Sequence, residues 1–203
     1  MILEVNALMS SYIVAIMELS TISDVRDAEL AEFETEIAHR WAIRGNETRD
    51  PYSKFLFYFI GFNALYFLWG RIKDLPAKDG LRFRDLVGSV TSNEASTIML
   101  ECKESVRFFS DRPITDMRAR PRSASQGLTV VGERNRRTLA NKSNTSEVRL
   151  KALSNIIYQV RNNLAHGSKG DFGDDRQVVT AAIEPTRRLL ELAIKETERT
   201  TSS

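Results

Sequence analysis

The stretch from Leu150 to Gly167 carries the clearest helical pattern in the chain, and it constrains the fold more than any other segment. At 100° per residue its large aliphatic side chains fall within about 60° of one line, which is the apolar stripe of a helix that packs against a core. These side chains are Leu150, Leu153, Ile156, Ile157, Val160 and Leu164. The opposite face carries a polar row, Asn155, Gln159, Asn162 and His166. The pattern therefore predicts an amphipathic helix that displays this row away from its own core.

Two residues at the end of this helix can carry chemistry. Arg161 lies on the flank between the two faces and His166 follows five positions later, so the pair spells Arg-x4-His. A guanidinium can neutralise phosphate charge, and an imidazole can transfer a proton near neutral pH. Asn162 adds a hydrogen-bonding amide, and Gly167 is suited to end the helix as a left-handed C-cap. Together these residues place a positive charge, a proton-transferring group and a hydrogen-bonding amide at one helix end.

The motif resembles the conserved sequence motif of the HEPN superfamily, a group of all-helical domains. Many of these domains are metal-independent ribonucleases of toxin–antitoxin, abortive-infection and CRISPR-associated systems. The resemblance rests on residues 158–167, YQVRNNLAHG, and on an earlier aromatic segment, residues 62–66, FNALY. It covers roughly residues 52–197, and it is specific at the motif and general elsewhere.

The resemblance implies a metal-independent endoribonuclease without a cofactor, acting as a toxin or antiviral-defence effector. Two protomers would pair as a homodimer and bring two motifs together, and RNA cleavage would leave a 2′,3′-cyclic phosphate and a 5′-hydroxyl. His166 would be the general acid or base, Arg161 would stabilise the phosphate charge, and Asn162 would position groups by hydrogen bonding. Asn63 and Tyr158 are expected to support the site, although Asn63 alternatively bonds a neighbouring helix. An antitoxin or another defence-system protein is a further expected partner.

One departure from the family pattern and the alternative functions must be weighed against this interpretation. Family members that are silenced by adenylylation carry a tyrosine two positions after the histidine, whereas this chain has Ser168 there, so that control route is not expected. A second class of function is a non-catalytic HEPN-like module that binds nucleic acid or a protein. A third is a purely structural dimerisation bundle. Separately, Arg161 and His166 could simply be two side chains on a solvent-facing helix end.

Composition bounds the class of protein. A chain of 203 residues with 42% hydrophobic and 28% charged residues suits one globular domain, residues 1–203. The net charge of +2 predicts no general attraction to nucleic acid, so a basic surface must be local. A single cysteine excludes an intramolecular disulfide, and with two histidines it leaves no cluster for a structural zinc ion. A reducing cytoplasm is the expected compartment.

Helices are also predicted before the motif. Residues 1–20 fit an amphipathic helix rather than a signal peptide, and residues 24–43 fit a second helix with a solvated acidic face and a structural His39. Residues 44–50 are predicted to be a polar loop that leads to a helix start at Asp50 and Pro51. The aromatic run 55–69 is shorter than the ~20 residues of a membrane span, so it is predicted to be a central helix, buried against its own bundle and a partner.

A basic segment separates the aromatic helix from the motif helix. From residue 103 to residue 142 ten Lys and Arg face four Asp and Glu, a local excess of +6. Its prolines and small residues predict a loop-rich insert over residues 110–142. This insert either grips a nucleic-acid backbone or is a solvated connection. The candidate substrate contacts are Arg134, Arg136, Arg137 and, after the motif, Lys169.

The remaining segments complete an all-α prediction. Residues 71–90 are expected to be a loop with a short helix, and Thr91 and Ser92 to cap the next helix, which includes Leu100 among its apolar contacts. The last helix keeps its register across Pro185 and is predicted to be one kinked helix. The expected fold is a HEPN-like bundle with core residues 52–197, N-terminal helices within residues 1–43 and the basic insert.

Overall fold

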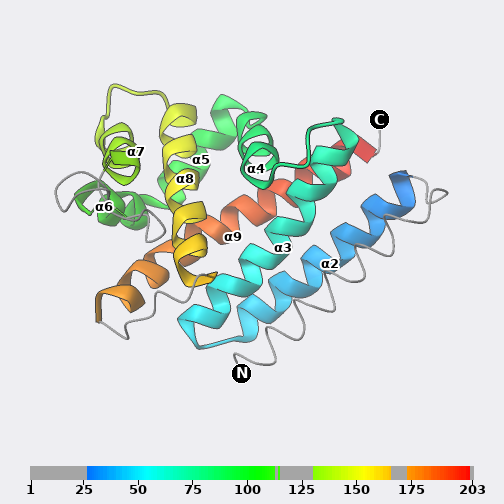
Figure 1. Ribbon diagram of the computed structural model, residues 1–203, viewed down its shortest axis with the longest axis horizontal. Helices are drawn as coiled ribbons and strands as arrows, with labels where there is room; N and C mark the ends of the chain where they lie inside the picture. Colours follow the sequence, from blue (N-terminus) through cyan, green and yellow to red (C-terminus); the bar gives the residue numbers. More distant parts are fainter. Residues whose placement is uncertain (1–26, 113, 115–129, 166–172, 202–203) are drawn as a thin grey trace.

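The computed structural model describes residues 27–112, 114, 130–165 and 173–201, and these form eight helices and no strand (Figure 1). The all-α prediction is therefore confirmed for this part of the chain. The helices are α2 (Asp27–Glu47), α3 (Pro51–Ile72), α4 (Asp79–Gly88), α5 (Ser92–Glu101), α6 (Lys103–Asp111), α7 (Val130–Ala140), α8 (Ser146–Ala165) and α9 (Gly173–Thr201). The expected helix over residues 1–20 lies outside the described residues.

Helix α3 is the centre of the bundle. It begins as predicted, because the Asp50 carboxylate accepts a hydrogen bond from the Ser53 backbone N–H at 2.8 Å and Pro51 occupies the first turn. Helices α2 and α9 run alongside it (Figure 1). Its aromatic side chains, including Phe55 and Phe62, are buried against these neighbours within the same chain.

Length and hydropathy alone would allow α3 to cross a membrane, and it is the one described helix of which this is true. Inside the bundle, however, 67% of its most apolar 18-residue window is buried. The same helix carries hydrogen-bonded polar side chains, among them Tyr58, whose hydroxyl donates to Asn46 at 2.7 Å. Helix α3 is therefore accounted for as the core helix of a bundle.

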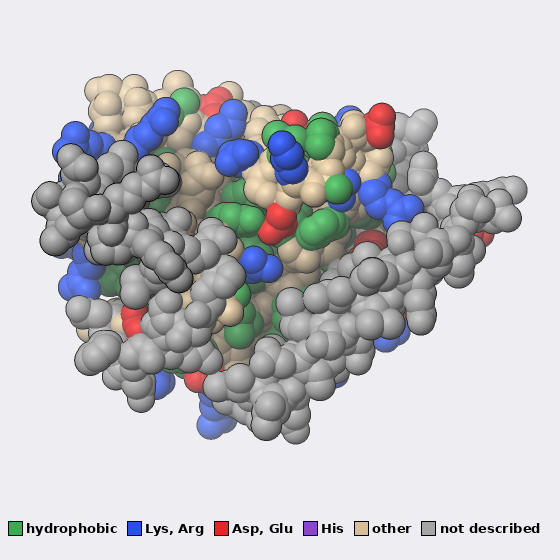
Figure 2. All heavy atoms as spheres, in the orientation of Figure 1, with side chains coloured by type: hydrophobic (Ala, Val, Ile, Leu, Met, Phe, Trp, Pro, Cys, Tyr) green, Lys and Arg blue, Asp and Glu red, His purple; other side chains and the backbone are tan. Residues whose placement is uncertain are grey.

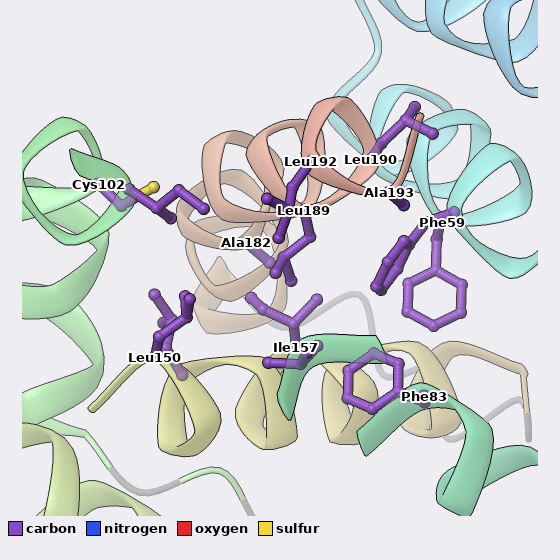
Figure 3. Packing of buried hydrophobic residues seen from close by; sticks show 14 of the residues in the cluster. Phe59, Phe83, Cys102, Leu150, Ile157, Ala182, Leu189, Leu190, Leu192 and Ala193 are labelled. Atoms are coloured by element: carbon purple, nitrogen blue, oxygen red, sulfur yellow. The ribbon is translucent and has the colours of Figure 1, made fainter. Parts of the chain in front are cut away.

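The apolar stripe predicted for the motif helix packs into this core. Leu150 and Ile157 of α8 are almost fully buried and face Ala182 and Leu189 of α9 (Figure 3). Helix α9 runs without interruption through Pro185, which confirms the prediction of one final helix. The aromatic, motif and final helices thus share one continuous hydrophobic cluster.

Some local predictions are wrong. Helix α2 continues to Glu47, so the first residues of the predicted loop 44–50 are helical. Glu34 is only 6% exposed rather than part of a solvated face, and Leu100 is 71% exposed rather than part of the core. The helix predicted after Thr91 is divided at Cys102 into α5 and α6.

The basic insert is also more ordered in its last third than its composition suggested. Residues 130–140 form helix α7, not loop. This helix packs very closely on the preceding segment, because a Cβ atom at Gly132 would lie 2.0 Å from the Ile114 carbonyl oxygen. Only glycine can occupy that position without moving the backbone, so α7 is fixed against residue 114.

Candidate functional site at the end of α8

The polar row of α8 lies opposite the apolar stripe as predicted, but it does not face open solvent. Asn155 and Gln159 are half-buried, and Asn162 is only 3% exposed. The prediction that Asn162 points out of the protomer is therefore wrong. The physical reason is tertiary, since α4 and α7 pack against this side of α8 and leave a groove between them.

Arg161 is held half-buried by two contacts. Its Nη1 donates a hydrogen bond to Asn162 Oδ1 at 3.1 Å, and its Cζ lies 5.5 Å from the centroid of the Phe59 ring. Among the described residues no carboxylate forms an ion pair with Arg161, so its charge is not neutralised locally by direct pairing. A guanidinium carries five N–H donors, and Asn162 uses one of them. Arg161 is thus oriented by its neighbours and keeps donors for a ligand.

A half-buried polar cluster close to Arg161 joins α3, α4 and α8. The Tyr158 hydroxyl donates to Asp79 Oδ2 at 2.8 Å, and the Tyr66 hydroxyl donates to Asp79 Oδ1. The Tyr66 hydroxyl also lies within hydrogen-bond distance of the Asn63 Oδ1 position. Because the Tyr66 hydroxyl has one proton and the carboxylate is the stronger acceptor, we infer that the Asn63 amide is turned to donate to the same hydroxyl. Asp79 therefore ties the start of α4 to both flanking helices.

Tyr66 acts in this cluster as a neutral donor. Burial raises its pKa far above the ordinary value, and the negative charge and hydrogen bond of Asp79 raise it further. The positive charge of Arg161 opposes this shift, which shows that the guanidinium is electrostatically close. Tyr66 consequently stays protonated at neutral pH and is not a base or a nucleophile.

Sequence reasoning recovered only part of this cluster. Tyr158, which was expected to support the site, donates its hydroxyl to Asp79. The contact found for Asn63 is with the Tyr66 hydroxyl of its own helix, and the two roles predicted for Asn63 stay predictions. Asp79 and Tyr66 were missed, although an acid at a helix start and a tyrosine one turn after Asn63 were both visible in the sequence.

The predicted substrate-binding arginines differ in their surroundings. Arg134 is exposed on α7 and lines the groove. Arg136 and Arg137 instead bind the carboxylate of Glu133, each at 2.7 Å, and Arg136 also donates to the Ser110 carbonyl oxygen at 2.9 Å. Hydrogen bonds from these two arginines lower the pKa of Glu133 to about 2. Arg136 and Arg137 are thus engaged in ion pairs of their own helix.

Two of the predicted site residues, His166 and Lys169, fall outside the described part of the chain. Within the described part, no three His, Cys, Asp or Glu side chains lie close enough together to hold a metal ion. Cys102 is buried, and burial raises the pKa of its thiol to about 12. This cysteine is consequently not a thiolate nucleophile at neutral pH.

The arrangement offers a fixed cation with unused donors at the end of a rigid helix, which suits the stabilisation of phosphate charge. The expected acid or base, His166, follows directly in sequence after the exposed last residue of α8, Ala165. Comparison of the chain with protein-family models, with curated proteins and with solved structures finds no match. Function must therefore be inferred from the site itself.

Proposed function

We propose that the chain is a metal-independent endoribonuclease of HEPN type, a toxin or defence effector that works as a homodimer. The observation that carries the proposal is the oriented Arg161 guanidinium, five residues before His166 and without a carboxylate partner among the described residues. A cation that is held in place and left unneutralised can stabilise the charge that develops on a phosphorane.

In the proposed reaction the 2′-hydroxyl of the substrate attacks the adjacent phosphorus and the 5′-oxygen leaves. His166 serves as the acid or base, and Arg161 donates hydrogen bonds to the phosphorane oxygens. Asn162 keeps the positioning role expected for it, and the group it positions in this proposal is Arg161, which donates a hydrogen bond to its carbonyl oxygen.

The chain offers few other groups for proton transfer near neutral pH. It contains two histidines, and the second, His39, is exposed on α2 with its Nε2 atom 3.8 Å from Glu198 Oε1 of α9. One histidine per chain cannot readily supply both the base and the acid. This shortage supports a site shared by two protomers, in which each contributes one His166.

The test uses purified full-length protein and labelled single-stranded RNA in EDTA. Cleavage is expected for the wild type, with a 2′,3′-cyclic phosphate product, and a 2′-deoxy substitution at the cleaved position should block it. Arg161→Ala and His166→Ala are each expected to lower the rate by at least about 100-fold, the usual cost of losing a group that stabilises the transition state. Arg107→Ala is the matched control, since Arg107 is an exposed arginine on α6.

Two results would contradict the proposal. Equal cleavage by wild type and both variants would point to a contaminating nuclease. RNA that binds in an Arg161-dependent way but stays intact would replace cleavage by the alternative of a non-catalytic nucleic-acid-binding module. Folding of each variant is checked by circular dichroism, because Arg161 is half-buried against Phe59.

A further inference from the structure

The groove beside the motif has the size of a small-molecule site. It encloses about 570 Å³ along α8, between α4 and α7, and a neighbouring hollow of about 410 Å³ shares Arg84 and Lys151 with it. Small-molecule pockets commonly measure ~300–1,000 Å³. Helix α4 runs antiparallel to α8 here, because Gly80 faces Tyr158 and Gly88 faces Lys151. The groove thus follows α8, with α4 on one side and α7 on the other.

Three cations line this groove, and they have no direct carboxylate partner in the part of the chain that the structure describes. They are Arg84 of α4, Arg134 of α7 and Lys151 of α8, and all three are exposed. Figure 2 shows Lys and Arg side chains gathered over the region of α4 and α8. The described residues that line the 570 Å³ groove include no Asp or Glu.

Two carboxylates close to these cations, Asp85 and Glu147, do not cancel this charge by pairing. Asp85 lines the neighbouring hollow, where its Oδ2 accepts a hydrogen bond from the Trp69 indole N–H at 2.8 Å. Glu147 accepts a hydrogen bond from the Ser92 hydroxyl, which is the main reason that its pKa falls to about 2. The charge of Lys151 contributes only the last of the causes of that shift. The groove therefore keeps a positive rim.

Between the cations the groove presents side chains that both donate and accept hydrogen bonds. The carboxamides of Asn135 and Asn155 are half-buried and have no hydrogen-bond partner among the described residues. Gln159 donates a hydrogen bond from its Nε2 to Asn163 Oδ1 at 2.8 Å. The carbonyl oxygen of Gln159 remains as an acceptor for a ligand. Half-buried amides without partners are costly unless water or a ligand satisfies them. Ile156 and Ala152 add an apolar floor.

We propose that this groove binds a phosphate monoester of a small polar molecule. The phosphate dianion lies among Arg84, Lys151 and Arg134, and the hydroxyl or amide groups of its carrier bond Asn155 and Gln159. The binding site is independent of the proposed ribonuclease reaction, because it requires neither Arg161 nor His166. It adjoins the motif through Asn162, which lines the groove and accepts the hydrogen bond of Arg161.

Calorimetry with the full-length chain tests this proposal. The probes are ribose 5-phosphate, adenosine 5′-monophosphate, inorganic phosphate, ribose and an RNA oligomer without a terminal phosphate. At least one monoester is expected to bind with a stoichiometry of one per chain, while ribose does not bind. Arg84→Ala and Lys151→Ala should each weaken that binding about tenfold, a loss of ~1.4 kcal/mol, because each removes a charge-assisted hydrogen bond to the phosphate.

Two further variants separate a built site from general charge attraction. Asn155→Leu keeps the side-chain size and should weaken the monoester without changing the affinity for inorganic phosphate. Arg107→Ala removes one positive charge from the exposed surface of α6 and should leave binding within about twofold of the wild type. Each substituted side chain is exposed or half-buried, so folding is expected to persist.

Three results would overturn the proposal. The first is the absence of saturable binding for every monoester. The second is an equal loss of binding in Arg107→Ala and Arg84→Ala, which would show attraction to net charge alone. The third is binding of the RNA oligomer that no monoester displaces, which would make the groove a path for RNA instead.

Discussion

Two sets of cations in this molecule are used in opposite ways. On α9, Arg187 and Arg188 both bind Glu184, at 2.6 and 2.9 Å, and Arg188 also reaches Glu101 at the end of α5 at 3.2 Å. Around the outer side of α8, the second set consists of Arg84, Arg134, Lys151 and Arg161. No member of this second set pairs with a carboxylate in the described part of the chain.

The difference separates cations that hold helices together from cations that are presented to a ligand. Lys195 repeats the first pattern, because it binds Glu94 at 2.7 Å and so links α9 to α5. Such half-exposed pairs contribute modestly, at most about 1 kcal/mol each. Unpaired neighbouring cations repel one another and add nothing to folding, so their placement favours a function in binding. The two sets should therefore respond differently to mutation.

The largest effect on stability is expected at Asp79. This carboxylate accepts hydrogen bonds from two tyrosines and, within the described part of the chain, forms no ion pair with the nearby unpaired cations. Asp79→Ala leaves two buried or half-buried hydroxyls, those of Tyr66 and Tyr158, without their acceptor. Hydrogen bonds to a charged group contribute ~1.5–3 kcal/mol each, and their loss is partly offset by water, so we expect a loss of about 2–4 kcal/mol. Urea unfolding followed by circular dichroism measures it.

Tyr158→Phe serves as the matched variant for this prediction. It removes one of the two hydrogen bonds to Asp79 and keeps the ring that packs 5.0 Å from Phe83, so it should cost about 1 kcal/mol. A loss below ~0.5 kcal/mol in Asp79→Ala would mean that the tyrosine cluster does not join α4 to the bundle.

The second prediction compares one member of each cation set directly. Arg187→Ala should lower the free energy of unfolding by about 1 kcal/mol, because it removes a half-buried guanidinium that pairs with both Glu184 and Glu191. Arg84→Ala should change it by less than ~0.5 kcal/mol, since Arg84 is exposed and unpaired within the described residues. In phosphate monoester binding the order should reverse, so that Arg84→Ala weakens the affinity more than Arg187→Ala does.

The measurement is urea unfolding of both variants beside the wild type, with the slope of the transition compared as well as its midpoint. Equal stability losses in Arg187→Ala and Arg84→Ala would remove the distinction between the two sets. A stability loss confined to Arg84→Ala would show that the groove cation has a structural role and would weaken the binding proposal.

The contrast between the sets also shows what the sequence can predict. Local periodicity predicted α3 and α8, because the faces of a helix follow from its own residues. The same pattern placed Asn162 on the correct side of α8 but in the wrong surroundings. Burial of that side depends on α4 and α7, which pack there through contacts distant in sequence.

Charge patterns were misread for a related reason. Glu133 lies three and four positions before Arg136 and Arg137, which is the spacing of helical ion pairs, but the segment was predicted to be loop. The unpaired state of Arg84 was invisible, because Asp85 beside it is used by Trp69 of another helix. Pairing on one helix is a local property, whereas the absence of pairing depends on the whole fold.

The smallest predicted effect concerns pH and the paired set. A hydrogen bond from Lys195, followed by one from Thr91, lowers the pKa of Glu94 from 4.5 to about 2. A carboxyl group whose folded pKa is depressed adds stability above its unfolded pKa and loses it as the pH falls toward the folded value. We therefore expect the Glu94 contribution to be complete at pH 7 and to disappear between about pH 5 and pH 2.

Because Lys195 is half-exposed, this contribution should stay below about 1 kcal/mol. Glu133 and Glu147, whose pKa values also fall to about 2, titrate over the same range, so the decisive quantity is the difference between wild type and Glu94→Gln. That difference, from urea unfolding at pH 7 and pH 3, should shrink at the lower pH, because at pH 3 Glu94 is largely protonated in the unfolded chain but still ionised in the folded one, so its charge stabilises the folded state less. A difference that stayed constant would mean that the carboxylate charge does not hold α5 to α9, and that this member of the paired set acts through its uncharged hydrogen bonds alone.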